Sequence, residues 1–454
     1  MNYPVWDVPI IGSGWVIGII AIIHVLISHF AVGGGVYLAV AEWKARREGR
    51  VEWLGYLKQH SYFFLVLTGV YGAVTGVAIW FAIGLAHPEG TSSLIHNFVF
   101  GWAIEWVFFL VELTAAAVYY YTWDRIPAKT HQMVGWVYAI ASILTLVIIN
   151  GILTFMLTPG KNWLAVAGTG READEFWYAF FNPTYWPSLI MRTAVCLAMA
   201  AIWGLVSASR IDGDEQAQLK TAIVRWSSMW LFPAFVLMPI CFVWYLYSIP
   251  PERSGLLELG ITTIGQGTFT QVTRAALVSV MTSATVLAIV YFVAYLRPTD
   301  FTLGHSLAVL AVALAATGST EYSRELLRKP YVVADYMYSS GVRKSDVERM
   351  NREGYLTNSP WSQLTANHSV ERGRLMFLGQ CACCHTTNGY RSMKTLLGER
   401  DRKAIGNLLE SLHNPGEDSP YRKFMPPLVG TSPEIASLGD YLLTINQSST
   451  SEHR

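Results

Sequence analysis

Charged residues are scarce in this chain, and their scarcity excludes most soluble proteins of its length. Asp, Glu, Lys and Arg make up only 14% of the 454 residues, whereas 52% are hydrophobic and 17 are Trp. Soluble globular domains usually carry about 25% charged residues. The composition therefore predicts a polytopic membrane protein.

The sequence contains few cysteines and no dense cluster of Lys and Arg. It is also expected to have no cleavable signal peptide. Three of the five cysteines are clustered, and Cys196 and Cys241 stand alone in apolar segments, where a small buried hydrophobe is the usual role. No disulfide framework is expected. A net charge of +1 without a basic cluster argues against nucleic-acid binding. The first apolar segment is too long for a signal peptide and lacks a basic leader, so we expect it to stay as a helix.

Long apolar runs dominate the first two thirds of the chain. Eight of them are each long enough to cross about 30 Å of hydrocarbon as a helix. They cover Trp15 to Ala41, Ser61 to Leu85, Phe98 to Tyr121, Val134 to Leu157, Trp186 to Ala208, Trp226 to Ile249, Ala275 to Leu296 and Phe301 to Thr317. The sequence therefore predicts an all-α polytopic bundle, and its even number of spans places both termini on one side.

Lysine and arginine are concentrated in alternate loops. The loops after the first, third and fifth runs carry these bases: Lys44, Arg46, Arg47, Arg50 and Lys58; Arg125 and Lys129; and Arg210, Lys220 and Arg225. Because loops rich in Lys and Arg stay in the cytoplasm, both termini are predicted to lie outside. The expected location is a bacterial plasma membrane, crossed several times, with both ends periplasmic.

The clustered cysteines lie in Cys381-Ala382-Cys383-Cys384-His385. This is the Cys-x-x-Cys-His spacing at which Cys381 and Cys384 bind one haem covalently and His385 ligates its iron. Met425, followed by two prolines, is the candidate for the other axial position. A zinc site needs two more ligands at matching spacing, and none lies nearby. Cys383 occupies a variable position and is expected to be a spare thiol.

Composition changes after the eighth run. Residues 331–366 form a polar connector, and residues 367–446 are predicted to form a small all-α cytochrome c domain with helices at Val370 to Gln380 and near Pro433 to Leu443. Residues 447–454 are a polar tail. Covalent haem attachment takes place outside the plasma membrane, which agrees independently with the side predicted from the basic loops.

Ionisable groups within the apolar runs are expensive and are therefore functional candidates. Glu105 and Glu112 are seven residues apart, so they share one face of the third helix. They are candidates for proton conduction or haem ligation. The alternative is that they only satisfy polar groups of neighbouring helices.

His24 and His29 lie on the first helix. Their five-residue offset turns them about 140° apart, so they cannot both face one iron. Gly33 to Gly35 follow on the same helix, and their lack of side chains would let a flat macrocycle or another helix approach closely.

A charged stripe lies near the outer end of the eighth helix, at spacings of three and four. Its members are Glu321, Arg324, Glu325 and Arg328. The stripe is either a surface ion-pair ladder or a haem site in which a Glu ligates iron and an Arg holds propionates. Arg192 and Arg274 are candidates for the same propionate role.

Residues 1–330 resemble subunit I of the cytochrome bd quinol oxidases. The similar segments are His24 followed by Glu42, Gly72-Ala73-Val74-Thr75-Gly76, Ala103-Ile104-Glu105, Val111-Glu112-Leu113, Trp123-Asp124-Arg125 with His131, and Glu325-Leu326-Leu327-Arg328-Lys329-Pro330-Tyr331. The resemblance implies non-covalent haem b and a possible haem d. It also implies that His24 ligates haem, that Glu105 and Glu112 are the family's two carboxylates, that Glu325 ligates a high-spin haem and that Arg328 contacts propionates.

The sequence departs from that family at its low-spin haem and its quinol site. The family's histidine on the fifth helix is replaced within Ile190-Met191-Arg192-Thr193, and its methionine on the seventh within Arg274-Ala275-Ala276. The quinol loop has shrunk to about Pro250 to Val272. A cytochrome c domain stands in place of the ninth helix, and Trp80 stands where the family has a Glu.

The leading hypothesis is a bd-like oxidase that takes electrons through one covalent haem c instead of from quinol. Electrons would pass to a high-spin haem near His24, Glu105 and Glu325, where O2 is reduced, while Glu112 relays protons. Expected partners are a second membrane subunit and a periplasmic donor such as another cytochrome c. The alternatives are a non-catalytic electron-transfer or anchor subunit of a larger respiratory complex, and reduction of another small molecule such as nitric oxide.

Overall fold

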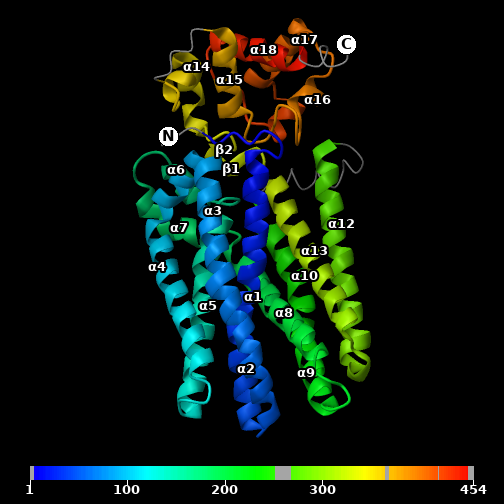
Figure 1. Ribbon diagram of the computed structural model, residues 1–454. Coiled ribbons are helices and arrows are strands. Elements are labelled where there is room, and N and C mark those ends of the chain that lie inside the picture. The colour runs from blue at the N-terminus through cyan, green and yellow to red at the C-terminus, as the bar shows by residue number, and fades with distance from the viewer. Residues whose placement is uncertain (1–4, 251–266, 363–367, 418, 448–454) are drawn as a thin grey trace.

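The computed structural model describes residues 5–250, 267–362, 368–417 and 419–447. A bundle of long helices is covered at one end by a smaller helical unit that contains the C-terminal part of the chain (Figure 1). Most of the short loop predicted at Pro250 to Val272 lies outside the described residues.

Within the described ranges, eight helical segments are long and apolar enough to cross a membrane, which confirms the predicted bundle. They are Ser13–Arg47 (α1), Val51–Ala86 (α2, Val51–Val66; η1, Leu67–Gly72; α3, Ala73–Ala86), Pro88–Tyr121 (α4), Ala128–Phe155 (α5), Tyr185–Ser209 (α8), Ala217–Ser248 (α9, Ala217–Met229; α10, Leu231–Ser248), Thr273–Tyr295 (α12, Gly267–Ile289; η3, Val290–Tyr295) and Leu303–Arg328 (α13). Several extend beyond their apolar runs. The whole charged stripe therefore belongs to α13.

Several of these segments are irregular along their length, and the seventh ends in the π-helical turn Val290–Tyr295. The second contains the π-helical turn Leu67–Gly72, a form that often marks functional sites. Helix α4 is kinked at Phe98, whose φ is −125° and ψ is 28°. Helix α10 contains Pro239, which cannot donate a backbone hydrogen bond.

Helix α1 lies at the centre of the bundle and packs against α2, α3, α5, α8 and α13 (Figure 1). A Cβ atom at Gly33 would overlap the carbonyl group of Cys196, and one at Gly34 would overlap the ring of Phe64. Of the two roles considered for Gly33 to Gly35, the structure therefore shows close helix packing.

Short elements close the end of the bundle at which α1 begins. They are α6 (Lys161–Val166), η2 (Glu172–Glu175), α7 (Phe176–Phe180), and an antiparallel hairpin of β1 (Tyr331–Val333) and β2 (Met337–Tyr338). A short 3-10 turn, η4 (Pro298–Asp300), precedes α13 at the other end. Val333 and Met337 of the hairpin are fully buried in one cluster with Phe155 and Trp163 of the bundle. The hairpin therefore attaches to the bundle.

The C-terminal unit has its own hydrophobic core. Its elements are η5 (Lys344–Asp346), α14 (Val347–Glu353), η6 (Leu356–Asn358), α15 (Ser369–Gln380), α16 (Met393–Leu397), α17 (Arg402–His413), η7 (Pro420–Lys423) and α18 (Ser432–Gln447). Helices α15 and α18 match the two predicted helices. Their contact is close, because a Cβ atom at Gly373 would overlap the backbone of Ser437.

Residues 331–362 contribute to both cores. Tyr355 and Trp361 are buried in the core of the C-terminal unit, and the Glu434 carboxylate accepts bonds from the Tyr355 and Leu356 amides at 2.9 and 2.8 Å. Because the hairpin at the start of the same segment packs on the bundle, this segment joins the two units through apolar contacts.

Candidate functional site

The Cys381 to His385 segment forms a tight turn at the end of α15. The amides of Cys384 and His385 both donate to the Cys381 carbonyl, at 3.0 and 2.9 Å. The Nδ1 atom of His385 lies 3.1 Å from the Arg391 carbonyl oxygen. A ring held in this way keeps its proton on Nδ1 and presents the Nε2 lone pair, which is the arrangement of metal-ligating histidines.

The thiols of this turn lie in contrasting surroundings. Burial raises the pKa of Cys381 to about 12. The Cys384 sulfur lies 3.8 Å from the Cys383 thiol and 3.5 Å from the Lys329 ammonium. Both neighbours lower the pKa of Cys384. Two thiols and an imidazole with a free Nε2 on one turn fit a covalently held haem. Met425 is half-buried, and its amide donates to the Tyr421 carbonyl at 2.8 Å.

The same turn rests on the end of the bundle at which α1 begins. The Ser13 hydroxyl at the start of α1 donates to the Ala382 carbonyl at 3.2 Å, and the Tyr390 amide donates to the Ile10 carbonyl at 2.8 Å. Lys329, one residue after α13, reaches Cys384. Sequence reasoning did not find this contact, because no local pattern links residues 10–15 to a turn more than 360 residues away.

His24 faces α3. Its Nδ1 lies 3.0 Å from the Thr75 hydroxyl, and a Cβ atom at Gly76 would lie 3.5 Å from its Cε1. The Ser28 hydroxyl is 3.4 Å from Nε2 but donates its proton to the His24 carbonyl at 2.7 Å. Thr75 therefore orients the ring, while the Nε2 lone pair is available to a metal.

His29 faces the opposite side of α1, as the five-residue offset requires. Its ring is buried, and Nδ1 has no hydrogen-bond partner within the part of the chain that is described. Arg192 of α8 and Glu321 of α13 lie within electrostatic range of the ring. A second imidazole therefore lies beside charged groups inside the bundle, on a different side of α1 from His24.

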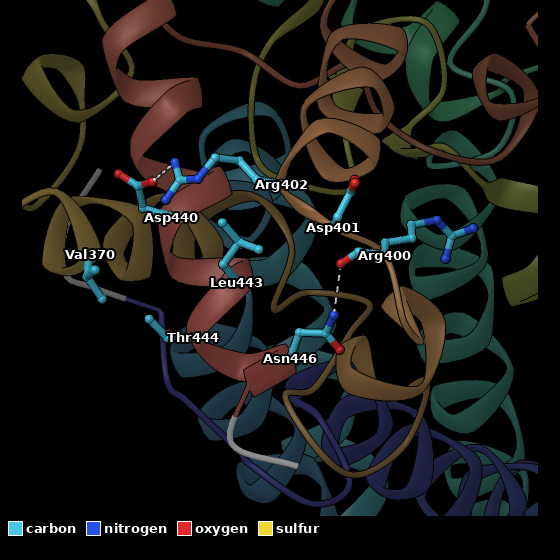
Figure 2. Close-up of a pocket in the computed structure, with 8 residues that line it drawn as sticks. All are labelled: Val370, Arg400, Asp401, Arg402, Asp440, Leu443, Thr444 and Asn446. Carbon is cyan, nitrogen blue, oxygen red and sulfur yellow. Dashed lines mark hydrogen bonds and ion pairs between the residues drawn. The ribbon is translucent and has the colours of Figure 1, made fainter. Parts of the chain in front are cut away.

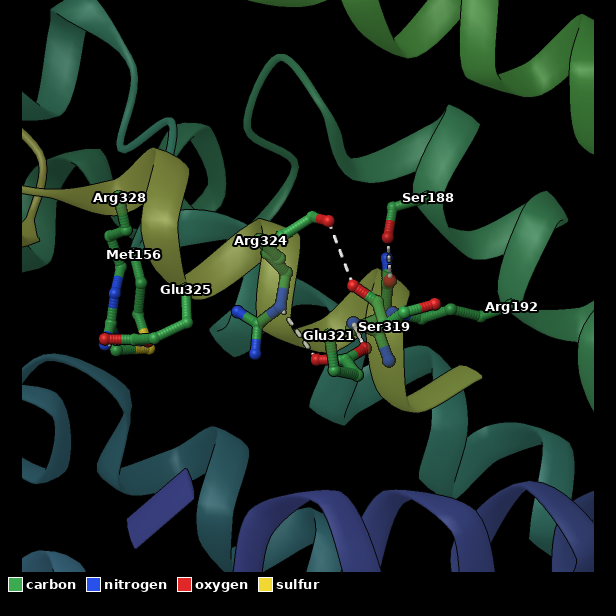
Figure 3. Close-up of polar contacts among 10 residues, drawn as sticks. Met156, Ser188, Arg192, Ser319, Glu321, Arg324, Glu325 and Arg328 are labelled. Carbon is green, nitrogen blue, oxygen red and sulfur yellow. Dashed lines mark hydrogen bonds and ion pairs between the residues drawn. The ribbon is translucent and has the colours of Figure 1, made fainter. Parts of the chain in front are cut away.

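The charged stripe on α13 forms a largely buried ladder (Figure 3). Glu321 bonds Arg192 at 3.4 Å and Arg324 at 2.9 Å, and the side chains of Glu321 and Arg192 are only 12% and 11% exposed. Arg328 bonds Glu325 at 2.6 Å. The ion pairs predicted by the spacing are present within α13, and Arg192 of α8 adds a pair between helices. The Glu325 side chain is still 41% exposed. Arg274, the other propionate candidate, is exposed.

Glu105 and Glu112 of α4 lie in different surroundings. Glu112 is 2% exposed, whereas Glu105 is half-buried between the exposed side chains of Ile104 and Trp106. A carboxylate on an apolar surface at bilayer depth needs a polar or metal partner. Among the described residues, Glu105 forms no hydrogen bond or ion pair with His24 or Glu325.

A second polar cluster lies at the other end of the bundle. His131 of α5 bonds Glu42 of α1 at 2.8 Å through Nδ1, and its Nε2 donates to the Tyr119 carbonyl at 2.9 Å. Arg46 bonds the same Glu42 oxygen at 2.7 Å. This cluster fixes α1 against α4 and α5, and two of its residues, Glu42 and His131, are among those that carried the resemblance.

A shallow hollow on the C-terminal unit shows no chemistry of its own (Figure 2). Arg402 bonds Asp440 across it at 2.6 Å, and the Asn446 amide donates to the Arg400 carbonyl at 3.0 Å. These bonds join the segment around α17 to α18.

Buried imidazoles and carboxylates in a membrane bundle are typical of proteins that bind metal cofactors or move protons. Residues 13–243 match the family model of the cytochrome bd terminal oxidase subunit I, and the chain belongs to that family. The fold resembles the structure of bd oxidase from Geobacillus thermodenitrificans, with 17% identity, a TM-score of 0.61, and coverage of 72% of this chain and 88% of that one. No curated protein matches the chain significantly.

Family and fold together assign the chain to a membrane respiratory oxidase. It is an oxidoreductase whose helices cross the membrane several times. Membership implies haems of the b and d types and a second membrane subunit.

Proposed function

We propose that the chain takes electrons through a covalent haem c at Cys381, Cys384 and His385, and delivers them to a membrane haem near His24, Glu105 and Glu325 for reduction of O2 to water. The observation that carries this proposal is the contact between the Cys381 to His385 turn and the outer ends of α1 and α13. In this division, residues 1–330 form the oxidase domain, 331–366 the connector, 367–446 the cytochrome c domain and 447–454 the tail.

The haem groups would supply one-electron chemistry, and the chain holds and orients them. At the outer site, His385 provides Nε2 and Met425 its thioether, while the Arg391 carbonyl fixes the imidazole. At the membrane site, His24 provides Nε2 with its ring held by Thr75. Arg328 bonds the Glu325 carboxylate, and in this proposal it would also contact the haem propionates.

Proton supply is assigned to the face of α4 that points into the bundle. Glu112 is buried two turns from Glu105 and faces the inside of the bundle. In this proposal Glu112 passes protons from the cytoplasmic side to the haem near Glu105, so turnover contributes to the proton-motive force.

The donor is proposed to be a periplasmic one-electron carrier such as another cytochrome c, with both termini of the chain outside a bacterial plasma membrane. A non-catalytic electron-transfer or anchor subunit is the competing function. The Arg192–Glu321 pair favours it, because Arg192 lies in the segment where the resemblance places a haem-ligating histidine, and its charge is already matched.

The test is O2 uptake by the purified holoprotein, with haem content measured by pyridine haemochrome and an open haem site by CO difference spectra. We expect one haem c, additional non-covalent haem, CO binding, and O2 uptake with reduced cytochrome c but not with quinol. Fully haem-loaded protein that binds no CO and consumes no O2 would leave only the anchor function.

Covalent haem attachment is tested separately by substitution of single thiols. Cys384→Ala removes a thioether, so we expect loss of the normal c-type absorption and of haem-stained protein in denaturing gels. Cys383→Ala is the matched control, because this neighbouring thiol is not at a Cys-x-x-Cys-His position. Equal haem retention in both variants would exclude the assigned site.

A further inference from the structure

We propose that Trp15 is the electron-transfer bridge between the two haem sites, and that residues Ile10 to Trp15 form the dock that holds the Cys381 to His385 turn over it. The inference rests on the proposed function. It names a route for the electron that follows neither from membership of the family nor from the Cys-x-x-Cys-His motif.

Trp15 joins two aromatic rings from distant parts of the chain. Its ring stacks on Tyr322 of α13, with centroids 6.0 Å apart and planes at 18°. It meets Tyr390, five residues after His385, edge to face at 5.5 Å and 84°. Tyr322 and Tyr390 also interact through their side chains. The three rings therefore form one contiguous group between the haem-binding turn and the membrane helices.

The dock is fitted closely to the turn on both sides of His385. A Cβ atom at Gly389 would overlap the Ile10 carbonyl, and one at Gly14 would lie 2.9 Å from the Cys383 carbonyl oxygen. The Tyr390 amide and the Ser13 hydroxyl add hydrogen bonds at 2.8 and 3.2 Å. Close backbone contact of this kind fixes the position of the turn.

Trp15 and Tyr322 lie on α1 and α13, which also carry His24 and Glu325, two of the residues assigned to the membrane haem. Trp15 is nine residues before His24 on α1, a rise of about 13 Å. Tyr322 precedes Glu325 by one turn on α13. Electron tunnelling weakens steeply across empty space and is favoured by packed atoms. The rings therefore extend packed contact from the turn to α1, along which His24 follows, and to α13 beside Glu325.

The step is a simple one-electron transfer. One electron leaves ferrous haem c, whose iron becomes ferric, and reduces a ferric membrane haem to the ferrous state. Trp15 is neither oxidised nor deprotonated in the net step, and a one-electron donor outside the chain reduces haem c again.

The experiment is anaerobic rapid mixing of the full-length holoprotein with reduced cytochrome c, while the c and membrane-haem absorption bands are recorded separately. For Trp15→Leu we expect unchanged reduction of haem c and slowing of membrane-haem reduction by about 10-fold to 100-fold, as for other losses of reacting geometry. Trp15→Phe keeps a ring and should recover most of the rate. An unchanged rate in Trp15→Leu would overturn the bridge.

The dock has a readout that does not depend on turnover. Gly389→Ala should displace the turn and expose the Arg391 peptide bond to trypsin, in addition to slowing the transfer. Gly406→Ala is the matched control, because an added Cβ there meets no atom within 4 Å. Equal trypsin resistance in both variants would overturn the dock.

These results are distinct from failure of the proposed function. If the unmodified protein never reduces its membrane haem or O2, the oxidase proposal fails. If it does both and the Trp15 variants match it, only the route is wrong.

Discussion

Glu321 shows how single residues decide the chemistry at bilayer depth. Its carboxylate lies between two arginines from two helices, Arg192 and Arg324 (Figure 3). Spacing along α13 predicted the bond to Arg324 but not the bond to Arg192, because a cross-helix partner leaves no trace in local sequence. The ladder therefore links α8 to α13 beside His29.

Removal of the Glu321 charge should destabilise the bundle. Glu321→Gln leaves two largely buried guanidinium groups without their carboxylate, and breaking such a buried pair costs about 3–5 kcal/mol. We expect a clearly lower melting temperature of the holoprotein in detergent. Asp174→Asn is the control, because Asp174 and its partner Arg171 are 57% and 72% exposed and exposed pairs contribute little. Equal melting of the two variants would contradict a stabilising role for the ladder.

At the scale of elements, the membrane helices could be predicted well and their partners could not. Length and hydropathy locate the spans because lipid satisfies no backbone hydrogen bonds. The charged last turns of α13, up to Arg328, were predicted from their three- and four-residue spacing and not from hydropathy, because the apolar run ends at Thr317. The roles of Gly33 and Gly389 depend on Cys196 and Ile10, which lie far away in sequence.

The joint between bundle and hairpin should be sensitive to acid. His87 precedes α4; its Nδ1 accepts from the Gly90 amide at 3.0 Å, and its Nε2 donates to the Ser339 carbonyl at 3.0 Å. Burial lowers the pKa of His87, and the bond to Ser339 only partly offsets this. The pKa of this histidine in the unfolded chain is about 6.5. Below that pH the unfolded chain binds the proton more readily than the folded chain does, so the free energy of unfolding decreases as the pH falls.

The acid effect is tested by measuring the melting temperature of the protein in detergent between pH 5 and pH 8. This window spans the pKa of about 6.5 of an unfolded-chain histidine. We expect His87→Gln to show a smaller loss of melting temperature on acidification than the unmodified protein. His96→Gln, at an exposed position on the same helix, should leave the pH dependence unchanged. Identical pH curves for all three proteins would exclude His87 as the source.

For the whole molecule, the main result is that residues 331–362 contribute to two cores. Sequence composition suggested a polar connector, because charged and small polar residues separate the apolar ones. Several of these apolar residues are nonetheless buried: Val333 and Met337 against the bundle, and Tyr355 and Trp361 in the C-terminal unit. The C-terminal unit is therefore held by this segment as well as by the dock at α1.

The dual attachment predicts where the chain can be shortened. A chain ending after Pro330 loses the hairpin, whereas one ending after Ser345 keeps it together with the bond from the Lys344 amide to the Tyr336 carbonyl at 2.8 Å. Val333 and Met337 are fully buried, and burial of each such side chain stabilises by about 1.5–3 kcal/mol.

We therefore expect the longer truncation to melt higher in detergent, and both truncations to lose electron input from reduced cytochrome c because the Cys381 to His385 turn is absent. The shorter chain exposes Trp163 and Phe155, which the hairpin covers, so it should also aggregate sooner on heating. Equal melting of the two would mean that the hairpin only connects the units and does not stabilise the bundle.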